Sequence, residues 1–82
     1  MYIKYLNNIH NIENYYSIIQ SESYVSTLNL VREGDSIYLQ FEDEDTKHYI
    51  LSKIWDYLTN GQIYFDIDEE VKVYKETKKY NL

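Results

Sequence analysis

The sequence predicts a single α+β domain, in which a small antiparallel β-sheet, made of a hairpin and a third strand, packs against one amphipathic helix. The chain has 82 residues, enough for one small hydrophobic core. One segment repeats its apolar residues at helical spacing, and two others alternate apolar with polar residues as half-buried strands do. Residues 1–82 are therefore expected to form one acidic domain.

A helix is predicted at about residues 45–60. Its apolar residues recur at helical spacing and are Ile50, Leu51, Ile54, Trp55 and Leu58. Asp45 is the expected N-cap, because its carboxylate can accept a hydrogen bond from an unpaired N–H group of the first turn. Asn60 and Gly61 supply the stop, since glycine tolerates the left-handed conformation that ends many helices.

A β-hairpin is predicted before this helix. Its strands are residues 26–31 and 36–42, and the segment 32–35 between them contains the Gly and Asp typical of turns. After the helix, residues 63–67 alternate apolar and polar side chains and are expected to add a third strand to the same sheet. The expected core, with Trp55 at its rim, comprises Leu28, Leu30, Ile37, Leu39, Phe41, Ile50, Leu51, Ile54, Leu58, Ile63, Phe65 and Ile67.

Both ends of the chain allow two interpretations. At 100° per residue, one arc gathers Tyr2, Tyr5, Leu6, Ile9, Ile12, Tyr16 and Ile19, which favours an N-terminal amphipathic helix over residues 2–19. The alternative is a strand at 1–6 and a second at 14–20, because this segment is rich in Asn, a poor helix former. Residues 69–79 suit either a helix, with acids first and lysines last, or an edge strand guarded by lysines.

The negative charge is concentrated in two clusters. Fourteen acidic residues against eight basic ones give a net charge of -6. The clusters are Glu42, Asp43, Glu44 and Asp45, then Asp66, Asp68, Glu69 and Glu70. Nucleic acids and anionic membranes bind through Lys and Arg, so such a surface would repel both and attract a basic protein partner.

The acidic clusters also have a purely structural interpretation. Carboxylates that precede a helix stabilise its N-terminus, and residues 66–70 suit a solvated strand end and turn. Four consecutive acids at residues 42–45 nevertheless exceed what one helix cap needs. The excess is unfavourable in the free protein and becomes useful when a cationic surface docks there.

Tyrosine is the second unusual feature, with eleven in the chain. Tyr38 and Tyr64 alternate with core residues in the predicted strands, so they should face the opposite side of the sheet. Tyrosine suits interfaces because it offers a large, rigid contact surface, and we assign both residues to the partner-binding surface. The absence of Ala favours the alternative of a compositional bias that places Tyr where Phe would serve.

Neither a cofactor, a metal nor an enzymatic activity is expected. His10 and His48 are far apart in the sequence and lie in no metal-ligand pattern. Residues 66–70 open like a calcium loop, but Val71 and Thr77 stand where that loop needs Gly and Glu. Neither glycine of the chain belongs to a phosphate-binding loop.

The sequence also bears on location. No apolar run approaches the roughly 18 residues of a membrane span, and the N-terminus lacks the apolar core of a signal peptide. The chain has no cysteine, which excludes disulfides and thiolate metal sites. We therefore expect a cytoplasmic protein that does not contact a membrane.

The segments REGDSIYLQFEDED, TNG and DIDEE follow one another as hairpin, acidic run, helix end and second acidic run. This layout, over roughly residues 26–76, resembles small acidic phage anti-CRISPR proteins that inhibit type II-A effector nucleases. The resemblance implies a nucleic-acid mimic, acting in the host cytoplasm, whose two acidic clusters occupy the DNA-recognition region of the nuclease. The Tyr-rich N-terminal third and the basic C-terminal end depart from that pattern and leave the target open.

Two other functions fit the same size and charge. An immunity protein or antitoxin would neutralise a basic toxin nuclease through the same acidic surface. A structural or regulatory module would self-associate through a strand edge or the tyrosine face. The docking functions share one expectation, namely that both acidic clusters converge on a single face and are not tied up by the chain's own lysines.

Overall fold

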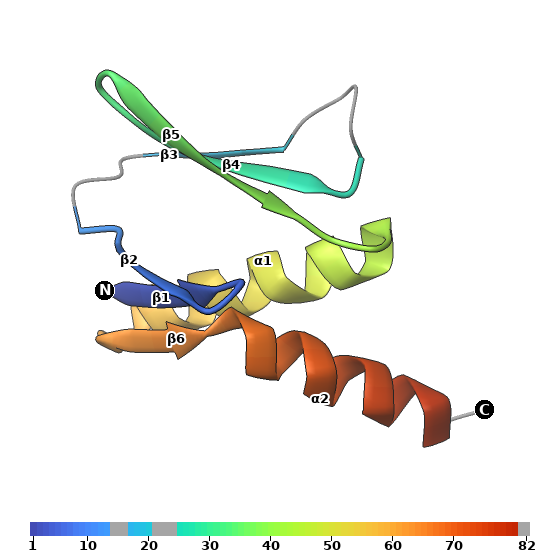
Figure 1. Ribbon diagram of the computed structural model, residues 1–82. Coiled ribbons are helices and arrows are strands. Elements are labelled where there is room, and N and C mark those ends of the chain that lie inside the picture. Colours follow the sequence, from blue (N-terminus) through green and yellow to red (C-terminus); the bar gives the residue numbers. More distant parts are fainter. Residues whose placement is uncertain (14–16, 21–24, 81–82) are drawn as a thin grey trace.

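The computed structural model describes residues 1–13, 17–20 and 25–80. Its elements are, in order, β1 (Tyr2–Tyr5), β2 (Asn8–Asn11), β3 (Ser17–Gln20), β4 (Thr27–Arg32), β5 (Asp35–Gln40), α1 (Glu44–Thr59), β6 (Tyr64–Asp66) and α2 (Ile67–Tyr80). The predicted α+β class is confirmed, with β2, β1 and β6 in one sheet and β3, β4 and β5 in another. In the view of Figure 1, the β3–β4–β5 sheet lies above α1, and the other sheet lies with α2 below.

The central hairpin and the long helix lie where the sequence predicts them. β4 and β5 pair antiparallel, and Gly34 in the turn between them has a φ of 78°. α1 ends at the cap residue Asn60, and the next residue, Gly61, has a φ of 69°. The prediction of Asp45 as N-cap is wrong, because α1 begins at Glu44 and Asp43 caps it.

The prediction of an N-terminal helix over residues 2–19 is wrong. β1 and β2 instead form an antiparallel hairpin, and both residues of its turn, Leu6 and Asn7, have positive φ values of 49° and 63°. Such a turn fits the right-handed twist of the strands, and Asn adopts this conformation readily. The strand alternative is the better description: β1 lies within residues 1–6 and β3 within residues 14–20, although 14–16 fall outside the described residues.

The strand after α1 exists, but its expected pairing is wrong. β6 runs parallel to β1, with Phe65 opposite Ile3, and does not join the β4–β5 hairpin. The apolar alternation of a strand shows which of its faces is buried and carries no information about its neighbour. Residues 69–79 adopt the helical alternative as part of α2, with three acids in the first turn and two lysines in the last.

The buried apolar residues come from both sheets and both helices and are Ile3, Ile12, Leu28, Leu30, Leu39, Phe41, Ile50, Ile54, Phe65 and Ile67. Ile37 and Leu51 are only partly buried. The predictions for Leu58 and Ile63 are wrong, since these residues are 43% and 78% exposed, and Trp55 is 56% exposed rather than at the rim. Ile3 and Ile12 are buried but do not belong to the predicted core; in an N-terminal helix Ile3 would lie off the apolar arc.

Candidate functional site

The first acidic cluster begins with a residue that holds α1 in place. Oδ1 of Asp43 accepts hydrogen bonds from the backbone N–H of Thr46 at 2.8 Å and from its hydroxyl at 2.7 Å. These bonds, led by the hydroxyl, lower the pKa of Asp43 because they favour the ionised carboxylate. Thr46 is buried, so the cap joins the acidic segment to the core. Asp43 therefore has a structural role.

The other three acids of this cluster are exposed, and each contacts a Lys or His side chain of the chain itself. Glu42 forms an ion pair with Lys75. Asp45 lies 3.1 Å from the ammonium of Lys78, and this hydrogen bond raises the pKa of Lys78. Glu44 lies 3.3 Å from the ring of His48 along the same helix. The side chains of Glu42 and Asp45 are 69% and 71% exposed, so both remain accessible to a partner.

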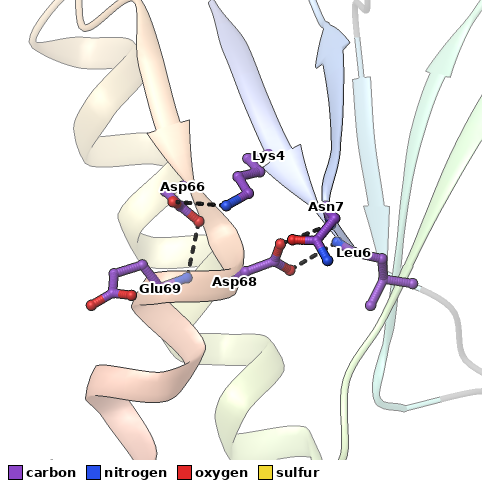
Figure 2. Close-up of polar contacts among 6 residues, drawn as sticks. All are labelled: Lys4, Leu6, Asn7, Asp66, Asp68 and Glu69. Atoms are coloured by element: carbon purple, nitrogen blue, oxygen red, sulfur yellow. Dashed lines mark hydrogen bonds and ion pairs between the residues drawn. The ribbon is translucent and has the colours of Figure 1, made fainter.

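The second acidic cluster fixes the junction between β6 and α2, as Figure 2 shows. Oδ1 of Asp66 accepts a hydrogen bond from the backbone N–H of Glu69 at 3.0 Å, and its other oxygen lies 3.8 Å from the ammonium of Lys4. The two oxygens of Asp68 accept hydrogen bonds from the backbone N–H groups of Leu6 and Asn7, at 2.8 and 3.0 Å. Asp68 thereby attaches the β1–β2 turn to the start of α2.

Glu69 and Glu70 take different directions from this junction. The side chain of Glu69 points away from Asp68 in Figure 2, and the residue is exposed. Glu70 accepts a hydrogen bond from the Tyr49 hydroxyl of α1 at 3.1 Å. The pKa of Tyr49 is raised above its usual value, mainly because the side chain is partly buried and also because of this hydrogen bond. The Tyr49 ring also stacks on Tyr74 of α2 with 4.4 Å between centroids, so these contacts hold the two helices together.

Two carboxylates of the first cluster, Glu42 and Asp45, contact lysines of α2, and two of the second cluster, Asp68 and Glu70, lie in the first turn of α2. We call this set the helix-pair surface; it consists of Glu42, Asp45, Asp68 and Glu70. Glu42 and Asp68, one from each cluster, line the same pocket. Lys75 and Lys78 pair with Glu42 and Asp45 and offset part of the negative charge there, which runs against the expectation that the acids are not tied up by the chain's own lysines. The sequence reasoning missed both lysines; their position in the last turns of α2 was the available signal, because a helix antiparallel to α1 would carry them to the acids that precede α1.

The predicted tyrosines lie in different sheets, and Tyr38 lines a pocket with Tyr5 and Gln40, which also line the pocket of Glu42 and Asp68. Tyr38 belongs to β5 and Tyr64 to β6, which are strands of different sheets. Both face away from the core as predicted, with 63% and 44% of each residue exposed. Tyr2, which is opposite Tyr64 in the register of β1 and β6, is 50% exposed and was not predicted as part of a surface. The two predicted tyrosines therefore do not form one continuous aromatic patch.

The described residues were compared with two further kinds of site, a metal centre and a membrane-spanning helix. Within that part of the chain, no three side chains of His, Asp or Glu are grouped so that they could hold a metal ion. The same residues include no helix with the length and apolar character needed to cross a bilayer.

The chain matches no protein-family model, no curated protein and no solved structure. The function of the site is therefore argued from the geometry given above.

Proposed function

We propose that this protein is a non-catalytic inhibitor that docks its helix-pair surface on a basic protein groove and so competes with nucleic acid. The observation that carries the proposal is the exposure of Glu42 and Asp45, whose side chains are about two-thirds open to solvent beside two further carboxylates. A groove that binds phosphates is lined by Lys and Arg. The carboxylates of the helix-pair surface would present several negative charges to such a groove.

The intramolecular ion pairs are compatible with docking. Pairs between exposed side chains contribute only about 0–1 kcal/mol, because solvent screens them and ordering two long side chains costs entropy. Cations of a partner can therefore replace Lys75 at Glu42 and Lys78 at Asp45. Asp43, Asp66 and Asp68 are less available to a partner, because their oxygens accept hydrogen bonds from backbone N–H groups of the fold.

A type II-A CRISPR effector nuclease is the target that we propose to examine first. The anti-CRISPR resemblance covers residues 26–76, which contain β4, β5, α1, β6 and most of α2. That stretch also supplies the whole helix-pair surface. An immunity protein acting on a basic toxin nuclease would use the same chemistry on another target. Self-association receives less support, because two copies with a net charge of -6 repel each other.

Competition binding tests the proposal. A guide-loaded type II-A effector nuclease is mixed with labelled target DNA, and the purified protein is added up to a large excess. We expect DNA binding to fall as the protein is added, and direct binding of the protein to the nuclease without DNA to weaken as salt is raised, because the contact is electrostatic. Undiminished DNA binding and cleavage at excess protein would reject this nuclease as the target. A panel of basic toxin nucleases under the same conditions then examines the immunity alternative.

A further inference from the structure

A small pocket opens on the helix-pair surface where β1, the end of β5 and α2 meet. Its volume is about 200 Å³, and Tyr5, Phe41 and Val71 give it an apolar lining. This volume is several times the roughly 30 Å³ that one water molecule occupies in the liquid. It is below the roughly 300–1,000 Å³ of pockets that bind small molecules. The pocket is thus of the size for one side chain of a partner.

The charges around the pocket indicate the kind of side chain. Glu42 and Asp68 line it, together with Lys75, so the carboxylates outnumber the cation. Backbone N–H groups of the β1–β2 turn hold both oxygens of Asp68, and this fixes the position of the carboxylate. An ionised carboxylate has about four lone-pair sites, so Asp68 keeps acceptor capacity beyond these two bonds.

The chain itself places a cation at this pocket. Lys75 pairs with Glu42 while the Lys75 side chain stays 49% exposed, so the ammonium is in exchange with solvent and can be displaced. The aromatic rings of Tyr5 and Phe41 contact each other edge to face with centroids 6.4 Å apart. The pocket therefore combines two carboxylates with aromatic surface, and its resident cation is weakly held.

We propose that this pocket receives an arginine side chain from the basic partner, which displaces Lys75. The inference rests on the proposed function and specifies which side chain of the basic partner the pocket binds. The apolar stem of arginine would lie against Val71, and its guanidinium would pack on the aromatic lining and reach Glu42 and Asp68. Arginine fits better than lysine, because a planar guanidinium stacks on rings and binds carboxylates with two parallel hydrogen bonds. A second copy of this chain is the weaker occupant because both copies carry a net negative charge.

Titration with two peptides tests this assignment. The probes are an arginine-rich peptide and a lysine-rich peptide of the same length and charge, and the readouts are calorimetry and the NMR shifts of Leu6 and Val71. We expect the arginine peptide to bind at least threefold more tightly and to move the signals of both pocket residues. Lys75→Gln should increase the affinity for the arginine peptide at least threefold, and Glu42→Gln should decrease it at least threefold.

Lys78→Gln is the matched control. It removes the same charge from the same helix, but its partner is Asp45, which does not line the pocket. Equal effects of Lys75→Gln and Lys78→Gln, or equal binding of both peptides, would overturn the pocket and leave the general acidic docking intact. Absence of binding by either peptide at low salt would overturn the docking function together with the pocket. Thermal unfolding of each variant, all at exposed side chains, confirms that the fold is retained.

Discussion

Three aspartates of the acidic clusters accept hydrogen bonds from backbone N–H groups of a helix start or a turn. Asp43 and Asp66 accept from N–H groups in the first turns of α1 and α2, and Asp68 accepts from the β1–β2 turn. The first four N–H groups of a helix have no partner within it, so these carboxylates replace water as acceptors. Part of the negative charge in these clusters therefore stabilises the fold itself.

Asp43 is the residue at which this role is measured most simply. Asp43→Ala should lower the free energy of unfolding by about 1 kcal/mol, the typical cost of losing a helix N-cap. Asp43→Asn should cost less, because an amide oxygen can still accept from Thr46. Urea unfolding of the three proteins at neutral pH provides the comparison. Equal stability of all three would contradict the capping role.

The same residue predicts a dependence on pH. The pKa of Asp43 is lower in the folded protein than its ordinary value of 3.8, so the folded state favours the ionised form. Its contribution is complete above the unfolded pKa and is lost as the pH falls through the folded pKa. The stability difference between the wild-type protein and Asp43→Asn should therefore shrink below about pH 4. A difference that stays constant to about pH 2 would be inconsistent with the lowered pKa.

Among the elements, α2 contacts both the first hairpin and α1. Its first turn binds the β1–β2 turn through Asp68 and α1 through Glu70, Tyr74 stacks on Tyr49 of α1, and its last turns bind the acids near the start of α1. β6 leads directly into it and pairs with β1. The position of the helix-pair surface therefore depends on the docking of α2.

Asp68 tests this docking. Asp68→Ala should release the β1–β2 turn, so the amide hydrogens of Leu6 and Asn7 should exchange with solvent at least about tenfold faster, as expected for a loss of about 1.4 kcal/mol in local opening. Glu69→Gln, at the neighbouring position whose side chain points away, is the control and should leave both rates unchanged. Hydrogen exchange followed by NMR gives the rates. Unchanged exchange in Asp68→Ala would show that the turn is held by other contacts.

The elements also show which features the sequence could predict. The β4–β5 hairpin and α1 were predictable, because turn residues and apolar periodicity within 20 residues determine them. The pairing of β6 with β1 joins residues about 60 positions apart, and no local pattern reports it. The lysine partners of Glu42 and Asp45 were missed for the same reason, since the contacts depend on how α2 packs against α1. Leu6 is an unusual residue for a position with positive φ, and it concealed the first hairpin.

At the scale of the whole molecule, the two acidic clusters converge in part. Glu42 and Asp68, one from each cluster, line the same pocket, while Asp43 and Asp66 cap the helices and Glu44 and Glu69 are exposed. A net charge of -6 on a chain of this size supports fast, salt-sensitive association with a basic surface. We propose that Glu42 and Asp45 dock on such a surface while the aspartate caps maintain the fold.

The affinity of a charge-neutralised variant for the effector nuclease tests that claim most directly. Glu42→Gln with Asp45→Asn removes two exposed charges of the helix-pair surface, and Glu13→Gln with Glu33→Gln removes two exposed charges elsewhere. At low salt we expect the first variant to bind about tenfold more weakly than the wild-type protein, equal to about 1.4 kcal/mol, with its melting temperature almost unchanged. We expect the second variant to bind within about twofold of the wild-type protein, since its charges lie outside the docking surface. Equal affinities of the two variants would show that Glu42 and Asp45 do not form the docking surface.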